Sequence, residues 1–505
     1  MMRRLHTWLL SSSLVVLGTA ALAHAESRAP ACFQVPEPTL SDFEGTWFGT
    51  LKVGIRELRL SFEISMEDGE LVAEWNSHDQ GALGLTINRI EVDGREIELT
   101  MRSAGATFTG TLSENGDRLV GTFEQHLSFP LELDRVEEVP APARPQTPQE
   151  PFPYRQIDVR FHHSEDEGAG LLAGTLTVPE GDGPFPAAIL ISGSGPQDRD
   201  ETLLDHKPFW VLADHLSRRG IAVLRYDDRG VAESDGDFDS ATTFEFANDA
   251  ASAVRFLVRH PLIDHHSIGL IGHSEGGLIA PIVAKKFRDL EGEKTGHKPI
   301  RLAYCVLIAG PAVDGREVLR VQQRLQLSAM GAEADEIARA QELQAKLLSA
   351  LLDSEGKDPS ATVELAAVEA WKDMTEDDKG LFGAAVEEEF VEQITATLGS
   401  EWMKTFLVLD PAEYLQSLRC PTLAIFGEKD VQVPPSQSAG PMREYLAATG
   451  VDLSKVVVFR ELNHLMQHCG TGSVEEYARI EETLAPEVLS EIGEFVRAVT
   501  KRQND

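Results

Sequence analysis

Cysteine is scarce in this sequence. The 505 residues contain four cysteines, Cys32, Cys305, Cys420 and Cys469. Proteins that depend on disulfides for their fold carry many more cysteines per residue, so a disulfide scaffold is excluded. The four are widely spaced and form no C-x-x-C motif, which argues against a zinc site built from cysteines. The sequence leaves open whether any two of them form a disulfide.

Positive charge is also in short supply. Lysine and arginine number 46 against 82 aspartates and glutamates, which gives a formal net charge of −36. Phosphate binding requires clustered cations, so this composition disfavours nucleic acids, anionic membranes and polyanionic substrates. We therefore predict no nucleic-acid partner and attribute the acidic surface to solubility.

Long apolar runs are absent after the first 25 residues. The N-terminus combines a basic start at residues 1–4 with an apolar stretch over residues 9–22 and the sequence Ala-His-Ala at residues 23–25. This is the pattern of a secretory signal peptide, and its apolar stretch is too short to span a membrane. We predict a signal peptide over residues 1–25, no membrane span in the mature chain, and a periplasmic or secreted location.

Short alternating segments separated by turn residues fill residues 42–136. Apolar residues occupy every second position from Leu58 to Ile64, for example, as expected of half-buried strands. Roughly eight such strands at hairpin spacing predict a small antiparallel β-barrel or sandwich. Residues 137–153 contain six prolines and predict an extended linker.

From Tyr154 onward, apolar runs alternate with helical stretches. The runs lie at residues 187–191, 221–224, 268–271, 303–308, 422–426 and 456–459. Uninterrupted apolar runs are typical of strands covered on both faces, so residues 154–500 predict a doubly wound, mostly parallel sheet. The connection from Ile308 to Thr422 is far longer than an ordinary crossover and is rich in Ala, Leu, Glu and Gln. It predicts a helical cap over residues 311–418.

Residues 272–276 read Gly-His-Ser-Glu-Gly and match the pattern G-x-S-x-G. The apolar strand at residues 268–271 leads into the motif, and a helix-forming stretch follows it. In this arrangement the serine occupies a strained strand-to-helix turn, and the glycines allow close backbone approach. The N-terminus of the helix also favours a developing negative charge. The motif predicts that Ser274 is a nucleophile.

A serine nucleophile needs a base and an orienting acid, which on such a sheet follow in the order Ser, Asp, His. Asp430 lies just beyond the strand at residues 422–426, and His464 lies on the last loop before the terminal helix. We predict that Asp430 and His464 complete a catalytic triad with Ser274. Asp314 follows the preceding strand and is the alternative acid, but the G-x-x-D-x-x-V-P context favours Asp430.

An acyl-transfer site also needs two backbone N–H groups for the oxyanion. We expect one from Glu275, which follows the nucleophile, and the other from Ser194, in the loop after the first parallel strand. Arg229 is a possible partner for a substrate carboxylate, but the Asp-Arg clusters around it favour a network that braces the loops.

No metal or cofactor is predicted. The paired histidines at residues 162–163 and 265–266 lack carboxylates at ligand spacing. A catalytic triad needs no metal.

Taken together, these motifs resemble those of the α/β-hydrolases. The S-G-P-Q-D-R-D run at residues 194–200, Asp-Arg-Gly at 228–230 and G-H-S-E-G-G at 272–277 are most similar to EstD-type bacterial esterases, which are also profiled as serine-aminopeptidase-like domains. The resemblance covers about residues 154–500. It implies an α/β-hydrolase fold and a metal-independent esterase that favours short acyl chains. The cap is expected to remodel the acyl pocket.

Three functions compete at this point. Hydrolysis of a small-molecule carboxylic ester is favoured. A serine exopeptidase on the same fold is the alternative, and it would need an acidic pocket for a free amino terminus, which no motif supplies. A non-catalytic protein whose β domain captures an apolar ligand is the third, and the triad argues against it. The natural substrate and the oligomeric state are not determined by the sequence.

Overall fold

The computed structural model of the protein describes residues 38–504, apart from segments at 54–55, 68, 81, 126, 141–142, 165–169, 292–298, 330–331, 355, 376–378 and 380–385. The predicted signal peptide at residues 1–25 and Cys32 lie outside the described residues. The chain divides into two compact units, Met1–Ala141 and Pro142–Asp505.

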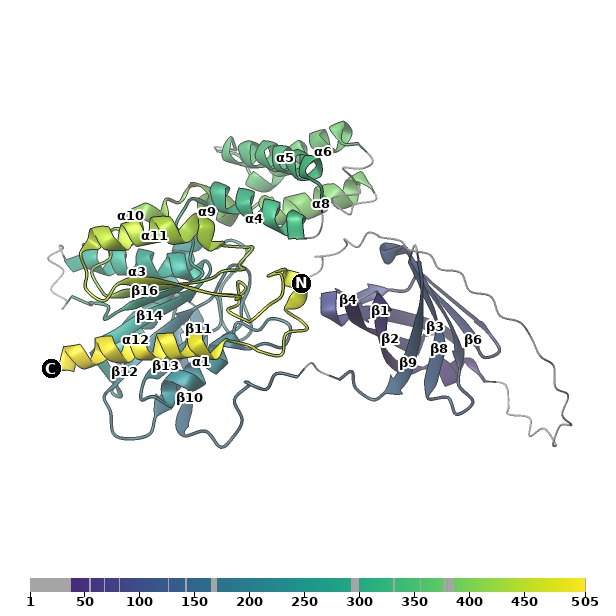
Figure 1. The fold of residues 1–505 in the computed structure, drawn as a ribbon, viewed down its shortest axis with the longest axis horizontal. Helices are drawn as coiled ribbons and strands as arrows, with labels where there is room; N and C mark the ends of the chain where they lie inside the picture. The colour runs from purple at the N-terminus through teal and green to yellow at the C-terminus, as the bar shows by residue number, and fades with distance from the viewer. Residues whose placement is uncertain are drawn as a thin grey trace, which may run out of the picture. The chain divides into compact units, whose positions relative to one another are not determined.

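The first unit is one curled antiparallel sheet, drawn in purple and blue in Figure 1. Its strands are β1 (Gly45–Val53), β2 (Arg56–Glu67), β3 (Glu70–Ser77), β4 (Ala82–Thr86), β5 (Arg89–Asp93), β6 (Glu96–Met101), β7 (Ala106–Leu112), β8 (Arg118–Gln125) and β9 (Leu127–Val136). They lie in the order β4-β3-β2-β1-β9-β8-β7-β6-β5. The predicted antiparallel β domain is confirmed, and its form is a curled half-barrel.

Alternation along the strands decides which side chains fill the inside of this sheet. In β7, every second residue from Ala106 to Leu112 is buried. Trp47, Phe62 and Phe108 are fully buried, and the rings of the two phenylalanines lie 5.5 Å apart. These large aromatic side chains give the unit a packed core of its own.

The second unit is built on an eight-stranded sheet. Its strands are β10 (Tyr154–His162), β11 (Leu171–Pro179), β12 (Phe185–Ile191), β13 (Ala222–Tyr226), β14 (Ile263–His273), β15 (Cys305–Ile308), β16 (Thr422–Gly427) and β17 (Lys455–Phe459). They lie in the order β10-β11-β13-β12-β14-β15-β16-β17. Strands β10 and β11 are antiparallel additions, and the strands from β13 to β17 in this order run parallel. The predicted mostly parallel sheet is confirmed.

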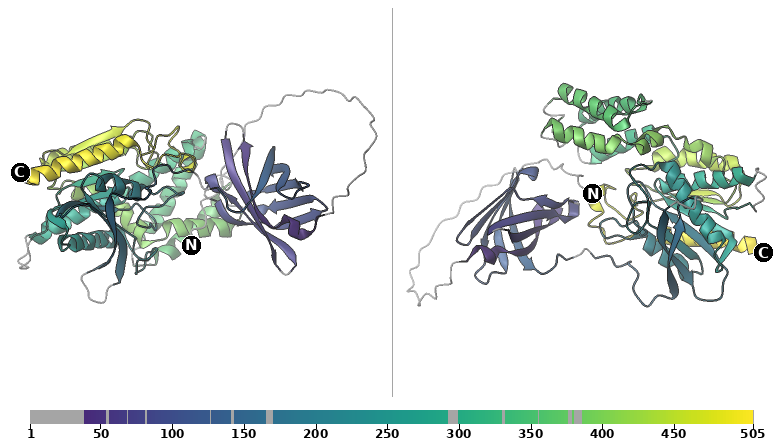
Figure 2. Two further views of the ribbon diagram at one scale, coloured as in Figure 1. Left: turned by 90° about the horizontal axis from the view of Figure 1, so that it is seen from below. Right: turned by 180° about the vertical axis from the view of Figure 1, so that it is seen from behind.

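Helices cover both faces of this sheet (Figure 1, Figure 2). They are α1 (Pro208–Ser217), α2 (Thr243–Val258), α3 (Gly276–Glu291), α11 (Pro435–Thr449) and α12 (Pro486–Asn504). Leu190 of β12 belongs to the core under α1 and α12, and its neighbour Ile189 belongs to the core under α2, α3 and α11. Successive side chains of a strand point to opposite faces, so an uninterrupted apolar run serves both cores.

Between β15 and β16 the chain leaves the sheet and forms the cap. Its described helices are α4 (Gly315–Ala329), α5 (Ala334–Leu352), α6 (Pro359–Asp373), α8 (Glu387–Leu398), α9 (Glu401–Val408) and α10 (Pro411–Leu415). Side chains fix where some of them begin: Asp358 accepts the N–H of Ala361 at α6, and Ser400 accepts the N–H of Met403 at α9. These helices lie within the range 311–418 predicted for the cap.

The proline-rich segment predicted as a linker over residues 137–153 is anchored to the second unit from Arg144 onward. The Arg144 guanidinium donates hydrogen bonds to the carbonyl oxygens of Leu204 (2.7 Å), Ala478 (3.1 Å) and Ile480 (3.1 Å). Gln146 exchanges hydrogen bonds with the backbone of Leu484 at 2.7 and 2.9 Å. This part of the segment therefore belongs to the second unit and ties two of its loops together.

Across the described residues, no helix is both long enough and apolar enough to cross a membrane.

We predict that Arg144→Ala destabilises the second unit. Three backbone carbonyls lose their donor, which should lower the free energy of unfolding by about 1–3 kcal/mol and the Tm by a few degrees. Differential scanning calorimetry of the full chain measures this. Arg155→Ala, at an exposed position of β10, is the matched control and should leave the Tm unchanged. An equal Tm for the two variants would show that the Arg144 contacts contribute nothing.

Candidate active site

Ser274 lies at the turn between β14 and α3, as the motif predicts. Its backbone has φ +53°, in the left-handed region that residues with a side chain rarely adopt. The neighbouring glycines are required here, because a Cβ on Gly272 would lie 1.9 Å from the carbonyl oxygen of Gly276. A Cβ on Gly276 would lie 2.2 Å from the carbonyl oxygen of Ile191. The turn therefore packs backbone against backbone and presents the Ser274 side chain at the end of the sheet.

His464 and Asp430 form a buried pair. Nδ1 of His464 lies 2.8 Å from Oδ2 of Asp430, and the two side chains are 5% and 0% exposed. Oδ1 of Asp430 accepts the backbone N–H groups of Gln432 and Val433, both at 2.8 Å. This carboxylate also accepts a hydrogen bond from the N–H at Nδ1 of His464. The other ring nitrogen, Nε2, is then left without a proton and can act as the base.

Asp314, the alternative acid, has a different role. Its carboxylate accepts the N–H of Glu317 at 3.0 Å at the start of α4. Its side chain is 40% exposed, and the Arg316 guanidinium lies 3.8 Å away. The structure thus pairs His464 with Asp430 and uses Asp314 to begin a cap helix.

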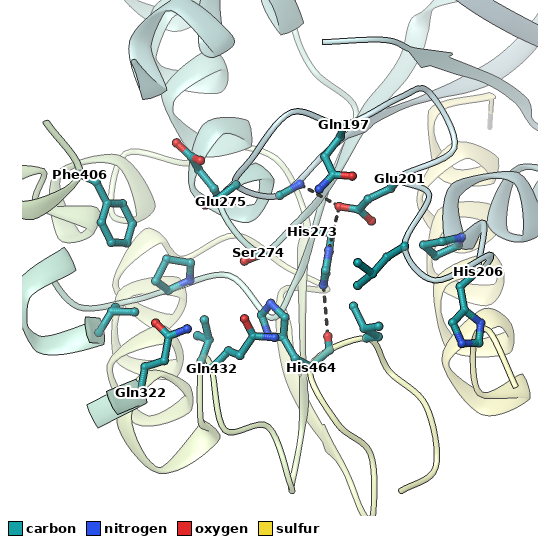
Figure 3. A pocket seen from close by; sticks show the side chains of 18 of the residues that line it. Gln197, Glu201, His206, His273, Ser274, Glu275, Gln322, Phe406, Gln432 and His464 are labelled. Carbon is teal, nitrogen blue, oxygen red and sulfur yellow. Dashed lines mark hydrogen bonds and ion pairs between the residues drawn. The ribbon is translucent and has the colours of Figure 1, made fainter. Parts of the chain in front are cut away.

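Ser274 and His464 line the same pocket, which has a volume of about 310 Å³. Figure 3 shows Ser274 at its centre, with His464 below and Glu275 above. Loops at the carboxyl ends of the strands form one side of the pocket, which is where ligands bind in open α/β sheets. The cap contributes the apolar side chains Val318, Leu319, Trp402 and Phe406.

The predicted oxyanion donors also line this pocket. The loop that carries Ser194 lies against the nucleophile, since a Cβ on Gly193 would lie 3.1 Å from Cβ of Ser274. The N–H of Gly193 is already bonded to Glu201 at 2.8 Å. Among the described residues, none accepts a hydrogen bond from the N–H of Ser194 or of Glu275. These two N–H groups are therefore available to a ligand.

The side chain of Glu275 has a role that its sequence position does not reveal. Its Oε1 accepts the Thr243 hydroxyl at 2.7 Å and the Trp402 indole N–H at 2.8 Å. Burial raises the pKa of the Glu275 carboxyl, and hydrogen bonds from Thr243, Trp402 and Ser194 offset part of the rise. Glu275 therefore links the cap to the start of α2. No local pattern identifies Trp402, which is 127 residues away in sequence.

The Asp-Arg clusters form ion pairs beside the site. Arg229 makes two hydrogen bonds to Asp249 of α2, at 2.6 and 2.7 Å. Arg199 pairs with Asp227 at 2.6 Å. Because both arginines are already paired with carboxylates, this arrangement fits a bracing network better than a substrate-carboxylate site.

Three cysteines are free thiols. Cys305 and Cys420 are buried on neighbouring segments of the sheet, with their sulfur atoms 3.7 Å apart, and Cys469 is half-buried. Within the described part of the chain, no cluster of three or more His, Cys, Asp or Glu side chains is arranged to hold a metal ion.

Comparison with known proteins finds several to which this chain is similar. The esterase EstD of Thermotoga maritima is 29% identical over 310 residues, which are 61% of this chain and 61% of EstD. The chain thus spans about three fifths of the length of that relative. Two solved structures with low identity are an esterase of Pyrococcus furiosus (15% identity, 72% of this chain and 99% of that one, TM-score 0.39) and a proline iminopeptidase of Mycobacterium smegmatis (17%, 68% and 98%, TM-score 0.40).

The decisive match is to a family model described as the alpha/beta hydrolase fold, which covers residues 189–471. This range includes the strands from β13 to β17 and the last three residues of β12, as well as the turn at Ser274 and the loop at His464. The model matches more than half of the chain, and the chain therefore belongs to the α/β-hydrolase fold family.

Proposed function

We propose that this protein is an exported serine hydrolase that cleaves carboxylic esters with short acyl chains. The observation that carries the proposal is the buried Asp430–His464 pair in one pocket with Ser274, whose backbone is strained as a nucleophile's is in this fold. The similarity to an esterase over three fifths of the chain supports the same reaction. The pattern of residues 1–25 supports export to the periplasm or the exterior.

The proposed reaction has two acyl-transfer steps. Nε2 of His464 takes the proton of the Ser274 hydroxyl as the oxygen attacks the ester carbonyl, and Asp430 stabilises the resulting imidazolium. The N–H groups of Ser194 and Glu275 stabilise the oxyanion. His464 then returns the proton to the leaving alcohol, which gives an acyl-Ser274 intermediate. Water, deprotonated by the same histidine, releases the acid and restores the serine.

The pocket acids support an esterase over an exopeptidase. An exopeptidase must bind the ammonium group of its substrate, which requires an unoccupied carboxylate near the nucleophile. Glu201 and Glu275 line the pocket, but Glu201 accepts hydrogen bonds from Gly193 and His273, and Glu275 from Thr243 and Trp402. Each carboxylate is already bonded to two protein donors, which makes it a weaker site for a substrate amine.

The wall formed by the cap supports short acyl chains. Trp402 and Phe406 are stacked, with ring centroids 5.4 Å apart and an angle of 7° between the rings. The indole N–H of Trp402 is fixed by Glu275. A volume of about 310 Å³ lies at the lower end of the range for small-molecule pockets. A rigid aromatic wall in a small pocket limits the length of the acyl group.

The first test concerns the nucleophile. Ser274→Ala should abolish hydrolysis of p-nitrophenyl butyrate and labelling by a fluorophosphonate probe, because the attacking oxygen is gone. Mass spectrometry of the parent should place the label on the peptide that contains Ser274. Ser328→Ala, at an exposed position of α4, is the control and should label like the parent. Labelling that survives in Ser274→Ala would assign the nucleophile to another residue.

The second test compares the two acids. Asp430→Asn should lower kcat by about 10⁴-fold, since the His464 imidazole loses the partner that sets its tautomer. Asp314→Asn should leave kcat within about threefold of the parent, because that carboxylate only begins α4. Steady-state kinetics, with circular dichroism as the check on folding, distinguishes the outcomes. A large loss confined to Asp314→Asn would transfer the acid to the strand before the cap.

The third test concerns acyl length and amide substrates. Trp402→Ala removes half of the aromatic wall and should raise kcat/KM for p-nitrophenyl octanoate relative to the butyrate by about tenfold, in line with the value of a few buried methylenes. Trp402→Phe keeps the wall and should retain the parent's preference. Aminoacyl p-nitroanilides should be poor substrates throughout. An aminoacyl amide that rivals the best ester in the parent would favour the exopeptidase.

A further inference from the structure

His273 lies beside the proposed nucleophile and has no part in the reaction described above. It is the last residue of β14, and its side chain is 10% exposed. Its ring packs against the ring of His464, with centroids 4.9 Å apart. Glu201, in the loop between β12 and α1, faces it with a side chain that is 8% exposed. A buried carboxylate and a buried imidazole thus meet beside the predicted nucleophile and the predicted base.

Both ring nitrogens of His273 face hydrogen-bond acceptors. Nδ1 lies 2.9 Å from Oε1 of Glu201, and Nε2 lies 3.2 Å from the backbone carbonyl oxygen of His464, as the dashed lines in Figure 3 show. A neutral imidazole carries one N–H and would leave one of these contacts without a proton. Both contacts are satisfied when His273 is an imidazolium.

The charges around His273 agree with this protonation state. Burial lowers the pKa of His273, but the charge and hydrogen bond of Glu201, the His464 carbonyl and the charge of Asp430 raise it, and the net pKa lies above its ordinary value. Three titratable groups face the ring: Glu201 from the β12–α1 loop, Asp430 from the loop after β16, and His464 from the loop after β17. Two of these are carboxylates, which favour the charged imidazole.

The same pair holds two loops of the proposed site. Oε1 of Glu201 also accepts the N–H of Gly193 at 2.8 Å, which fixes the residue before Ser194. Nε2 of His273 fixes the backbone of His464 itself. Glu201 has φ 52°, a left-handed conformation that a glutamate keeps only where its surroundings hold it. The pair thus aligns an oxyanion donor and the base on either side of Ser274.

We infer that Glu201 and His273 form a buried carboxylate–imidazolium pair that positions the Ser194 loop and the His464 loop for catalysis. The inference rests on the proposed function for the reaction that the pair supports. Both are positioning residues, since they act through Gly193 and through the backbone of His464.

Glu201→Gln tests the charge with almost no change of shape. In the parent, one oxygen atom of Glu201 serves two donors, Gly193 and His273. If the amide oxygen of the glutamine takes that place, a neutral His273 keeps its proton on Nδ1 and faces the His464 carbonyl with a bare nitrogen. If the amide nitrogen takes it, the N–H of Gly193 faces another donor. One of the two loops loses its contact in either case.

The expected result depends on pH. Removal of the Glu201 charge lowers the pKa of His273, because burial is no longer opposed by that partner. The imidazolium is present below its pKa, so in Glu201→Gln it is lost at lower pH than in the parent. The alkaline limb of the plot of kcat/KM against pH should shift to lower pH by about one unit or more. Between the lowered pKa and that of the parent, kcat should fall by about 10–100-fold, with a smaller loss at lower pH and a change in KM below about threefold.

Two further variants separate this result from a general loss of structure. Glu201→Asp keeps the carboxylate and should recover the parent's pH profile in part. Glu482→Gln makes the same chemical change at a surface pair with His468, whose side chain is 50% exposed, and should leave kinetics at the parent level. A loss in Glu201→Gln that is uniform from pH 6 to pH 9 would overturn the positioning role of the charge.

The protonation state is read directly by NMR of the parent with ¹⁵N-labelled histidine, without substrate. In a pH titration we expect one imidazolium signal that persists to higher pH than that of an ordinary histidine, that Glu482→Gln leaves in place and that Glu201→Gln shifts to lower pH. The inference is overturned if Glu201→Gln shifts no histidine signal to lower pH. Because this measurement needs no turnover, an inactive parent would contradict the proposed function alone. An active parent with a neutral His273 would contradict the inference alone.

Discussion

The left-handed backbone of Ser274 is the constraint around which the second unit is arranged. A residue with a side chain pays about 1–3 kcal/mol for such a conformation and keeps it only where neighbouring structure imposes it. Here β14 enters the turn between β12 and β15, and the N–H of Ser274 is bonded to the carbonyl of Ile308 at 2.8 Å. The close packing of Gly276 against Ile191 fixes α3 on the other side. The loops after β12, β16 and β17 then meet at one serine.

Three buried carboxylates lie in or beside this pocket: Glu201 and Glu275 line it, and Asp430 is paired with His464, which also lines it. A buried carboxylate is costly unless donors surround it, and each of the three found here has them. Asp430 is supplied by two backbone N–H groups and His464, Glu201 by Gly193 and His273, and Glu275 by a hydroxyl and an indole. Although the chain has a net charge of −36, the carboxylates at its proposed reaction centre are already hydrogen-bonded to protein donors. Such a centre suits a neutral ester better than a cationic amine.

Local patterns in the sequence were enough to place Ser274 on a strand-to-helix turn, Asp430 after the strand that follows the cap, and His464 before the last helix. The structure brings Asp430 and His464 into contact. The contacts of Glu201 with His273, and of His273 with His464, join residues 72 and 191 positions apart and leave no local pattern. For the first unit, alternation showed which side chains face inward, but it could not show how nine strands close, because barrel and sandwich share that alternation. The contacts of Arg144 could not be predicted either. A proline-rich segment indicates an extended chain but not which residues that chain contacts.

The cap is separate from the sheet in sequence but contacts the rest of the second unit at several points, for example where Gln437 of α11 donates to the Glu317 carbonyl of α4 at 2.6 Å. Ile308 and Thr422, which bracket the cap, lie on adjacent parallel strands. The pairing of these two strands therefore does not depend on the structure of the segment between them. Cap length and composition can therefore vary without moving Ser274, Asp430 or His464. One cap contact reaches the proposed site directly: the side chain of Glu275, our proposed oxyanion donor, accepts the indole N–H of Trp402 in α9. If Glu275 acts as proposed, a change in this wall also reaches the oxyanion donor, and chain-length preference is then tied to turnover as well as to binding.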